Sequence, residues 1–94
     1  MAAYWMVHVN ILDADKVKAY APLAAKTVET YGGKYLARGG DYLVKEGANY
    51  VRNVVVEWPS MDVAQRAYDS PEYKEALATL DGGVERLFVM VEGI

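Results

Sequence analysis

Two glycine pairs, Gly32-Gly33 and Gly39-Gly40, bracket five residues that are too few for a helix and well suited to a strand. A glycine directly after a helix supplies the left-handed residue that ends it, and a glycine after a strand lets the chain kink or turn sharply. The sequence therefore predicts a strand over residues 34–38, preceded by a helix and followed by a turn. The rest of the chain is arranged around this strand.

Three other segments alternate with period two, which is typical of half-buried strands. In residues 4–11, one face carries Trp5, Val7, Val9 and Ile11, and the other carries Tyr4, Met6, His8 and Asn10. In residues 51–58, one face carries Arg52, Val54, Val56 and Trp58, and the other carries Val51, Asn53, Val55 and Glu57. In residues 86–92, Leu87, Val89 and Val91 lie opposite Arg86, Phe88, Met90 and Glu92. We expect the aliphatic face to carry helices, and the face with Tyr4, Met6 and His8 to meet a less apolar surface.

Helical spacing marks the two intervening regions. A helix is predicted from a cap at Asp13 or Asp15 to about residue 31, with a kink or break near residues 18–21 because Pro22 removes a backbone hydrogen bond. A second helix begins after Ser60, and Ser70-Pro71 starts a new or re-oriented segment that runs to Leu80. Residues 42–46 are predicted to continue the second strand or to form the first arm of a hairpin.

The order strand, helix, strand, strand, helix, strand is that of the α+β ferredoxin-like fold, βαββαβ. We expect residues 1–94 to form a single domain with a four-stranded antiparallel sheet and both helices on one face. A chain of 94 residues buries only about 60–65% of its unfolded surface, and association is a common remedy. The open sheet face is therefore predicted to form a homodimer, sheet against sheet, with side chains or a cavity enclosed between the sheets.

Composition limits the classes of partner. The chain has no cysteine, which excludes disulfides and thiol chemistry, and its net charge of −3 without a basic cluster argues against nucleic acid. Its start lacks the features of a signal peptide, and no apolar run approaches the length of a membrane span. We expect a cytoplasmic protein that contacts neither membrane nor nucleic acid. One histidine and scattered carboxylates predict no metal site, and no cofactor is expected.

Several short motifs in fixed order resemble one bacterial family, catalogued as domain of unknown function thirteen-thirty. They are residues 31–40, 45–47, 56–60, 68–73 and 91–93, together with Arg52. The resemblance covers nearly the whole chain and implies a dimeric α/β-barrel, in the superfamily that includes small cofactor-free monooxygenases and muconolactone-isomerase-like enzymes. It implies no activity. The chain departs from the family pattern at Leu80, where Arg is frequent, and at Trp58, where Phe is commoner.

His8 and Glu57 are the candidate catalytic residues. His8 is the only histidine, and on a mixed sheet face it is either a general base or a hydrogen-bonded interface residue. Glu57 in the middle of a sheet must be paired or have a raised pKa, so it is either a salt-bridge partner of Arg38 or Arg52 or a proton acceptor.

Arg38, Gly39, Gly40, Arg52, Tyr68 and Tyr73 are the candidate ligand-binding residues. The guanidinium of Arg38 can grip a carboxylate in bidentate fashion, and the bare backbone of Gly39 and Gly40 would let a ligand approach; the alternative is an ion pair of Arg38 with Glu46, Glu57 or a partner chain. Tyr68 and Tyr73 line a pocket mouth or, as is commoner at helical spacing, belong to the core.

The sequence supports two hypotheses about function, which belong to different classes of protein. The first is a cofactor-free binder of, or enzyme on, a small organic acid or phenolic molecule, with His8, Arg38 and Glu57 among Tyr4, Met6 and Phe88 in a cavity between the sheets of a homodimer. The alternative is a non-enzymatic dimerisation module without a ligand, whose polar inner face fixes only the register of the two sheets.

Overall fold

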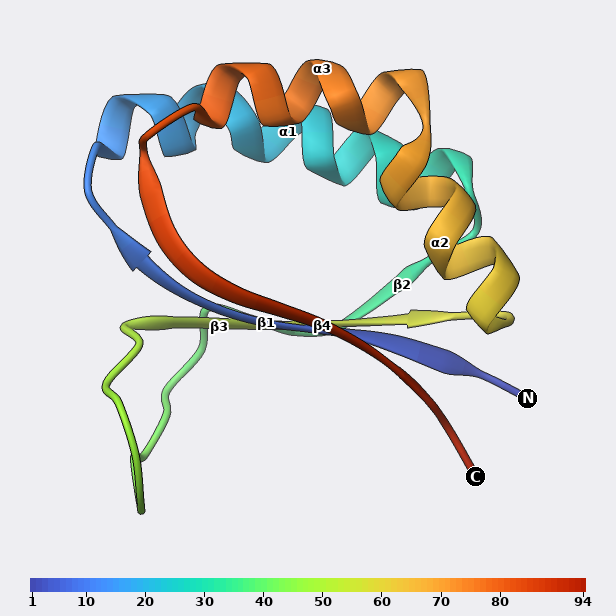
Figure 1. Cartoon of the computed structure of the whole chain (residues 1–94), viewed down its shortest axis with the longest axis horizontal. Coiled ribbons are helices and arrows are strands. Elements are labelled where there is room, and N and C mark those ends of the chain that lie inside the picture. The colour runs from blue at the N-terminus through green and yellow to red at the C-terminus, as the bar shows by residue number, and fades with distance from the viewer.

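A computed structural model describes all 94 residues of the chain. The strands are β1 (Ala3–Ile11), β2 (Lys34–Arg38), β3 (Arg52–Trp58) and β4 (Val84–Glu92). The helices are α1 (Ala14–Thr30), α2 (Met61–Asp69) and α3 (Pro71–Leu80) (Figure 1). The predicted strand order along the chain is confirmed, and the second helical region is divided in two at Ser70, as the Ser-Pro pair indicated.

The four strands form one antiparallel sheet in the order β2-β3-β1-β4. The helices lie on one face of this sheet and leave the other open, which is the ferredoxin-like α+β arrangement (Figure 1). Register places Val9 of β1 opposite both Arg52 of β3 and Arg86 of β4. Those two arginines therefore occupy the same row of the sheet, on the face that carries the helices.

An aromatic cluster forms the centre of the core between sheet and helices. The ring of Trp5 lies 4.7 Å from that of Trp58, 5.2 Å from Tyr73 and 5.1 Å from Phe88, measured between centroids. Trp5 Nε1 donates a hydrogen bond of 3.2 Å to the carbonyl of Ala64, which fixes α2 on the sheet. The predicted burial of the Trp5, Val7 and Val9 row under the helices is confirmed.

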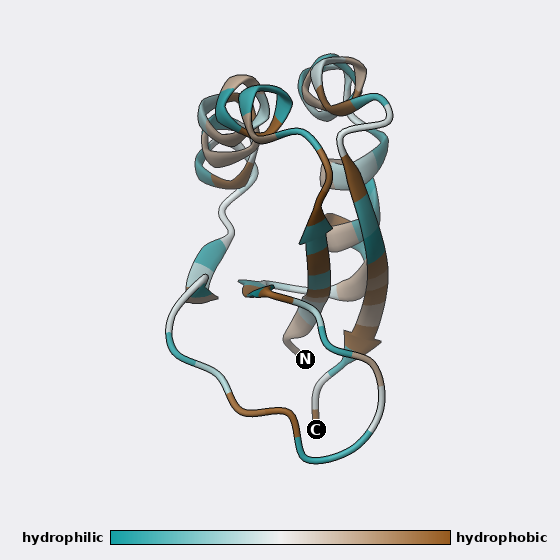
Figure 2. Cartoon of the chain, turned by 90° about the vertical axis from the view of Figure 1, so that its left-hand side faces the viewer, coloured by the Kyte–Doolittle hydropathy of each residue, from teal (hydrophilic) through white to brown (hydrophobic).

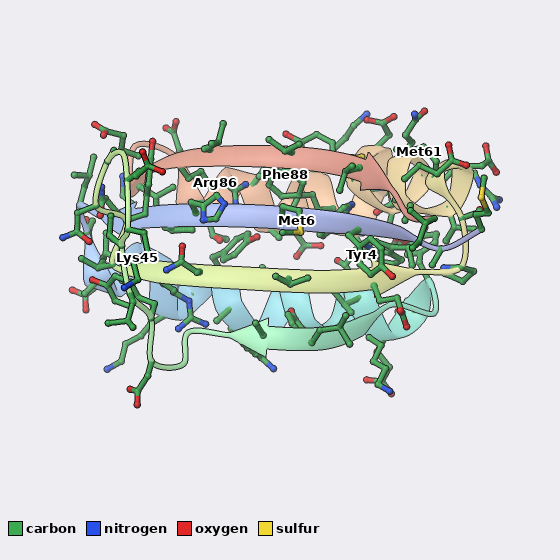
Figure 3. All side chains as sticks on the ribbon, turned by 90° about the horizontal axis from the view of Figure 1, so that it is seen from below. Tyr4, Met6, Lys45, Met61, Arg86 and Phe88 are labelled. Atoms are coloured by element: carbon green, nitrogen blue, oxygen red, sulfur yellow. The ribbon has the colours of Figure 1, made fainter.

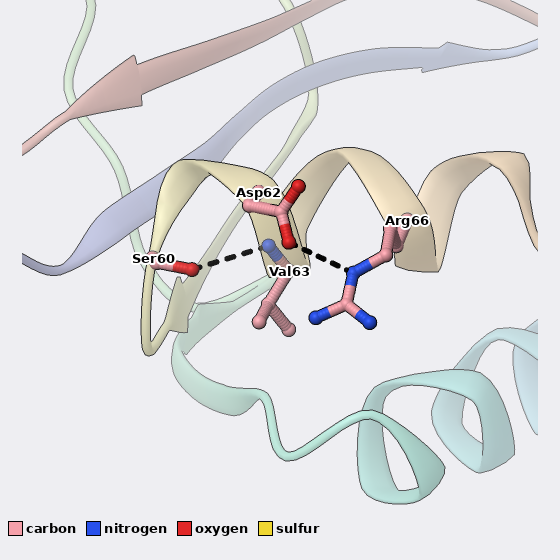
Figure 4. A network of polar contacts seen from close by, with 4 residues as sticks. All are labelled: Ser60, Asp62, Val63 and Arg66. Atoms are coloured by element: carbon pink, nitrogen blue, oxygen red, sulfur yellow. Dashed lines mark hydrogen bonds and ion pairs between the residues drawn. The ribbon is translucent and has the colours of Figure 1, made fainter.

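Each helix begins at a side-chain cap that the sequence indicates. Asp13 accepts from the amides of Asp15 and Lys16 at the start of α1. The hydroxyl of Ser60 accepts from the amide of Val63 at the start of α2, where Asp62 and Arg66 form an exposed ion pair of 3.0 Å (Figure 4). Ser70 caps α3 in the same way. These caps satisfy amides that have no partner within their own helix.

Two local features differ from the predictions. Of the kink or break expected near residues 18–21, the break is absent, since α1 contains Pro22 and runs from Ala14 to Thr30 as one element. Residues 42–46 form no strand, because Gly39 adopts a φ of +71° after its amide bonds the carbonyl of Asn53, and the chain then leaves the sheet. The loop from Gly39 to Val51 extends away from the helices, below the sheet (Figure 1).

The open face of the sheet carries a mixture of apolar and polar side chains. Tyr4 and Met6 of β1 lie on this face (Figure 3). Register aligns them with Val91 and Val89 of β4, whose side chains are 45% and 41% exposed. The loop between β2 and β3 lies beside this face and includes a hydrophobic stretch (Figure 2). None of the three helices has the length and hydropathy needed to cross a membrane.

Candidate functional site

A cavity lies between the sheet and the helices, on the side of the sheet opposite the open face. The cavity volume open to the centre of a water-sized sphere is about 70 Å³. Its walls come from all four strands and from α1 and α3. Fifteen of the eighteen lining residues are hydrophobic or tyrosine, and the remaining three are Arg38, Arg52 and Arg86. The cavity therefore combines an apolar interior with guanidinium groups as its only charges.

These three arginines come from three different strands. Arg52 and Arg86 lie on either side of Val9 in one row of the sheet, so their Cα atoms are about 10 Å apart, twice the strand spacing. Arg38 reaches the same face because β2 has a bulge between Tyr35 and Ala37. Regular alternation would have placed Arg38 opposite Asn53 on the open face; the bulge places it opposite Val54 instead.

Arg38 and Arg52 lie near the end of β2 and are held by neutral contacts. The guanidinium of Arg38 stacks over the ring of Tyr35, 4.3 Å from the ring centroid. Arg38 as a whole is exposed to solvent. Arg52 is half-buried, and its guanidinium lies over the backbone of Gly39, where an added Cβ would come within 2.5 Å of Nη1. The space above Gly39 is thus occupied by a side chain of this chain.

Arg86 belongs to a second group of polar atoms, which we call the Tyr20–Tyr73–Arg86 cluster. The hydroxyls of Tyr20 and Tyr73 are 2.5 Å apart and hydrogen-bonded. Arg86 donates from Nη1 to the hydroxyl of Tyr20 and from Nη2 to that of Tyr73, each at 3.3 Å. Its guanidinium also lies over the ring of Phe88, at 5.1 Å. Tyr73 is fully buried, so this cluster marks the inner part of the cavity.

No carboxylate balances these charges. None of the lining residues is acidic, and the only ion pair in the chain joins Asp62 to Arg66 on the outer surface of α2. The sequence contains four arginines, so every arginine except Arg66 lines the cavity. Guanidinium groups in a partly buried site are usually paired with an anion, since desolvation of an unpaired charge is costly.

The cavity also shifts the pKa values of its titratable groups. Burial is the largest cause that raises the pKa of Tyr73 above its ordinary value, with a further contribution from Tyr20. Burial likewise raises the pKa of Tyr35, and the charges of Arg38 and Arg52 oppose it. Burial lowers the pKa of Arg86, but the oxygens of Tyr73 and Tyr20 outweigh that effect and raise it overall. Around neutral pH the hydroxyls of Tyr73 and Tyr35 are therefore protonated and Arg86 is a cation.

The structure separates the residues that the sequence grouped into one site. His8 and Glu57 lie on the open face, where His8 Nδ1 is 2.6 Å from Asn53 Oδ1 and Tyr4 donates to Glu57 at 3.4 Å. The expected grouping of Arg38 with His8 and Glu57 on one face is wrong, because the bulge in β2 turns Arg38 to the other face. An ion pair of Glu57 with Arg38 or Arg52 is likewise absent.

Phe88 was also expected beside Tyr4 and Met6, and this placement is wrong. Register sets Phe88 opposite Val7, on the helix-covered face. Tyr68 and Tyr73 both join the aromatic cluster, their rings 5.3 Å apart, and only Tyr73 lines the cavity. Gly40 has no atom within 4 Å of an added Cβ, and with Gly39 it borders a shallow hollow of the loop. Leu80, a position where the chain departs from the pattern it resembles, lines the cavity as well.

Sequence reasoning missed Tyr20, Tyr35 and Arg86. One signal was available for Arg86, which shares its row with the apolar residues Phe88 and Met90, so that a charge lies beside an apolar stretch of that row. Tyr20 follows the apolar spacing of α1 and gave no signal beyond that of a core residue. Only the approach of α1, α3 and β4 in space brings these polar atoms together.

Comparison with known proteins identifies relatives of the chain. The model of the family described as Domain of unknown function (DUF1330) matches residues 2–94. The chain matches no curated protein sequence. Among solved structures, a protein of unknown function from Rhodopseudomonas palustris has a TM-score of 0.82 and 18% identity, over 99% of this chain and 82% of that one.

Two further solved structures are similar in fold. A dimeric ferredoxin-like protein of unknown function from Thermobifida fusca has a TM-score of 0.67 and 19% identity, over 99% of this chain and 92% of that one. SnoaB, a cofactor-independent oxygenase from Streptomyces nogalater, has a TM-score of 0.68 and 12% identity, over 98% and 92%. At such identities the likeness shows the ferredoxin-like fold alone.

Proposed function

This chain belongs to the family described as Domain of unknown function (DUF1330), and we propose that it binds a small organic acid in the cavity between its sheet and its helices. The acid's carboxylate contacts Arg38 and Arg52, and its apolar body lies against the aliphatic and aromatic walls. A carrier and a cofactor-free enzyme would both bind such an acid, so the proposal includes both. The similar fold of a cofactor-independent oxygenase supports the enzyme as one of them.

One observation carries this proposal: the cavity holds three of the four arginines and no acidic residue. The planar guanidinium matches a carboxylate in bidentate geometry, and a partly dry site strengthens such a charge-assisted pair. The apolar walls require that the rest of the molecule be hydrophobic. An inorganic anion would leave those walls without contacts, so an amphipathic acid is the better match.

We propose that the chain is a homodimer through its open sheet face. Two similar solved proteins are described as dimeric with a ferredoxin-like fold, and the open face carries half-exposed Leu87, Val89 and Val91 beside Tyr4 and Met6. His8 and Glu57 would then lie at the interface, each already engaged in a hydrogen bond. In this arrangement the ligand cavity lies on the far side of each sheet from the interface.

The alternative is a dimerisation module that has no ligand. It assigns a role to the open face, but it gives no role to three arginines gathered in an apolar cavity. It predicts that no small acid binds, whereas the ligand hypothesis predicts binding that depends on charge.

The test is a titration of the purified protein with benzoate, phenylacetate and hexanoate, followed by calorimetry or by the fluorescence of Trp5, which lines the cavity. At least one of these acids is expected to bind, and benzamide, a neutral analogue of benzoate, at least tenfold more weakly. Arg52→Gln is expected to abolish binding of the acid. Arg66→Gln, which removes the one arginine outside the cavity, is the matched control and leaves binding unchanged. Equal affinities for benzoate and benzamide, or no binding of any acid, would contradict the proposal.

A further inference from the structure

The Tyr20–Tyr73–Arg86 cluster has more hydrogen-bond donors than acceptors. Arg86 carries five N–H groups and uses two of them on the tyrosine hydroxyls. Of the two tyrosine O–H groups, one donates to the other hydroxyl, and the second has no acceptor in the chain, whichever tyrosine it belongs to. Four donors of this partly buried cluster are therefore without an acceptor from the protein.

The acceptor oxygens of the cluster are already occupied. Each tyrosine oxygen accepts a hydrogen bond from one N–H of Arg86. One of the two oxygens also accepts a hydrogen bond from the hydroxyl of the other tyrosine. The neighbouring wall residues Phe88 and Val84 offer no side-chain acceptor. A site with a cation, a spare hydroxyl and no carboxylate is suited to an oxygen atom that carries negative charge.

This oxygen differs from the carboxylate already assigned to the cavity. The guanidinium of Arg52 lies over Gly39, whereas that of Arg86 is held by the hydroxyls of Tyr20 and Tyr73. Because the two guanidiniums occupy different places, a small molecule with oxygens at its two ends matches them better than a single carboxylate does. Val9 lies between the two arginines in the sheet, and Tyr35 and Phe88 are among the aromatic residues that line the same cavity. An apolar, aromatic body is suited to such walls.

We infer, on the basis of the proposed function, that the ligand is an aromatic acid with a second oxygen, a phenol or enol, and that the Tyr20–Tyr73–Arg86 cluster binds this oxygen as its anion. The unused donors and the charge of Arg86 oppose the desolvation that disfavours the deprotonated form of the ligand oxygen. Arg38 and Arg52 position the ligand, and the cluster acts on the oxygen that loses its proton. The proton passes to solvent, and no other reactant is required.

The test compares benzoate with 3-hydroxybenzoate and 4-hydroxybenzoate, which have the same carboxylate and ring. At least one hydroxybenzoate is expected to bind about tenfold more tightly than benzoate, as hydrogen bonds between a charged group and an anion allow. Ultraviolet difference spectra at pH 7 are expected to show the phenolate band of the bound hydroxybenzoate, at a pH where the free phenol is protonated.

Tyr20→Phe is the decisive variant, and Tyr42→Phe, in the exposed loop, is its control. The ratio of hydroxybenzoate to benzoate affinity is expected to fall to about one in Tyr20→Phe and to persist in Tyr42→Phe. Should Tyr20→Phe fail to fold, Tyr73→Phe removes the other hydroxyl and tests the same ratio. If benzoate binds through Arg52 but neither hydroxybenzoate gains affinity or ionises, this inference is overturned while the proposed function stands. If no acid binds, both fail.

Discussion

A Cβ atom placed on Gly39 would lie 2.5 Å from Nη1 of Arg52, so the missing side chain of one residue makes room for the guanidinium of the other. Gly39 also adopts a φ of +71°, a backbone conformation that residues with side chains rarely adopt. This single glycine thus ends the pairing of β2 and determines where a cavity arginine lies.

We predict that Gly39→Ala displaces Arg52 and weakens binding of a small organic acid. The positive φ alone is expected to cost about 1 kcal/mol of stability or more. The measurements are urea denaturation and the benzoate titration described above. Gly40→Ala is the control, because an added Cβ there meets no atom within 4 Å. Equal effects of the two substitutions would show that the contact with Arg52 is unimportant.

Gly33→Ala is expected to destabilise the core. An added Cβ would lie 2.9 Å from ring atoms of Trp58 and 2.9 Å from Cγ1 of Val28, and Trp58 is almost fully buried. Overpacking of this kind costs about 1–3 kcal/mol, and in a domain of this size each kcal/mol lowers the Tm by about 4–8 °C. A thermal melt compared with that of Gly40→Ala measures the effect. An unchanged Tm would mean that the helix-to-strand turn relaxes freely.

Stability is expected to fall at alkaline pH through the buried tyrosines. Burial raises the pKa of Tyr73 and of Tyr35 in the folded state, so above about pH 10 the unfolded chain loses protons that the folded chain retains. The contribution of these two protonated tyrosines to the free energy of unfolding is fully present below about pH 10 and is lost as the pH rises above it. Urea denaturation at pH 8 and pH 11 measures the loss, and Tyr73→Phe is expected to reduce it. A loss of the same size in Tyr73→Phe would assign it to other groups.

Val89→Lys is expected to convert a dimer into a monomer. Val89 lies on the open face, opposite Met6, and a lysine at the centre of a sheet-to-sheet interface would bury an unpaired charge. Sedimentation velocity measures the mass of the assembly, and far-UV circular dichroism confirms folding. Leu12→Lys, at an exposed position between β1 and α1, is the control and is expected to remain dimeric. A dimer that persists in Val89→Lys would place the interface elsewhere.

In α2, the capping residue Ser60 is expected to contribute more to the stability of the fold than the ion pair of Asp62 with Arg66. Ser60→Ala removes the acceptor of the Val63 amide and is expected to cost about 1 kcal/mol. Arg66→Ala removes an exposed pair with Asp62 and is expected to cost less than about 0.5 kcal/mol. Denaturation midpoints of both variants test this order, and the reverse order would contradict it.

The fold could be predicted because its signals are local. The alternation of β1 assigned Trp5, Val7 and Val9 to the covered face, and Ser60 and Ser70 marked the starts of two helices. The site was predicted only in its residue types: Arg38, Arg52 and Tyr73 line the cavity, whereas His8 and Glu57 lie across the sheet from it. Alternation alone could not show that a bulge in β2 reverses the direction of Arg38.

The sequence by itself thus determined the elements, their order and the apolar face of β1, because period, capping residues and glycine pairs act over a few neighbouring positions. Tertiary structure alone decided that Arg52 and Arg86 flank Val9, and that Tyr20 of α1 meets Tyr73 of α3 beside them. These contacts depend on strand register and helix placement, which are set by the packing of the entire core around Trp5.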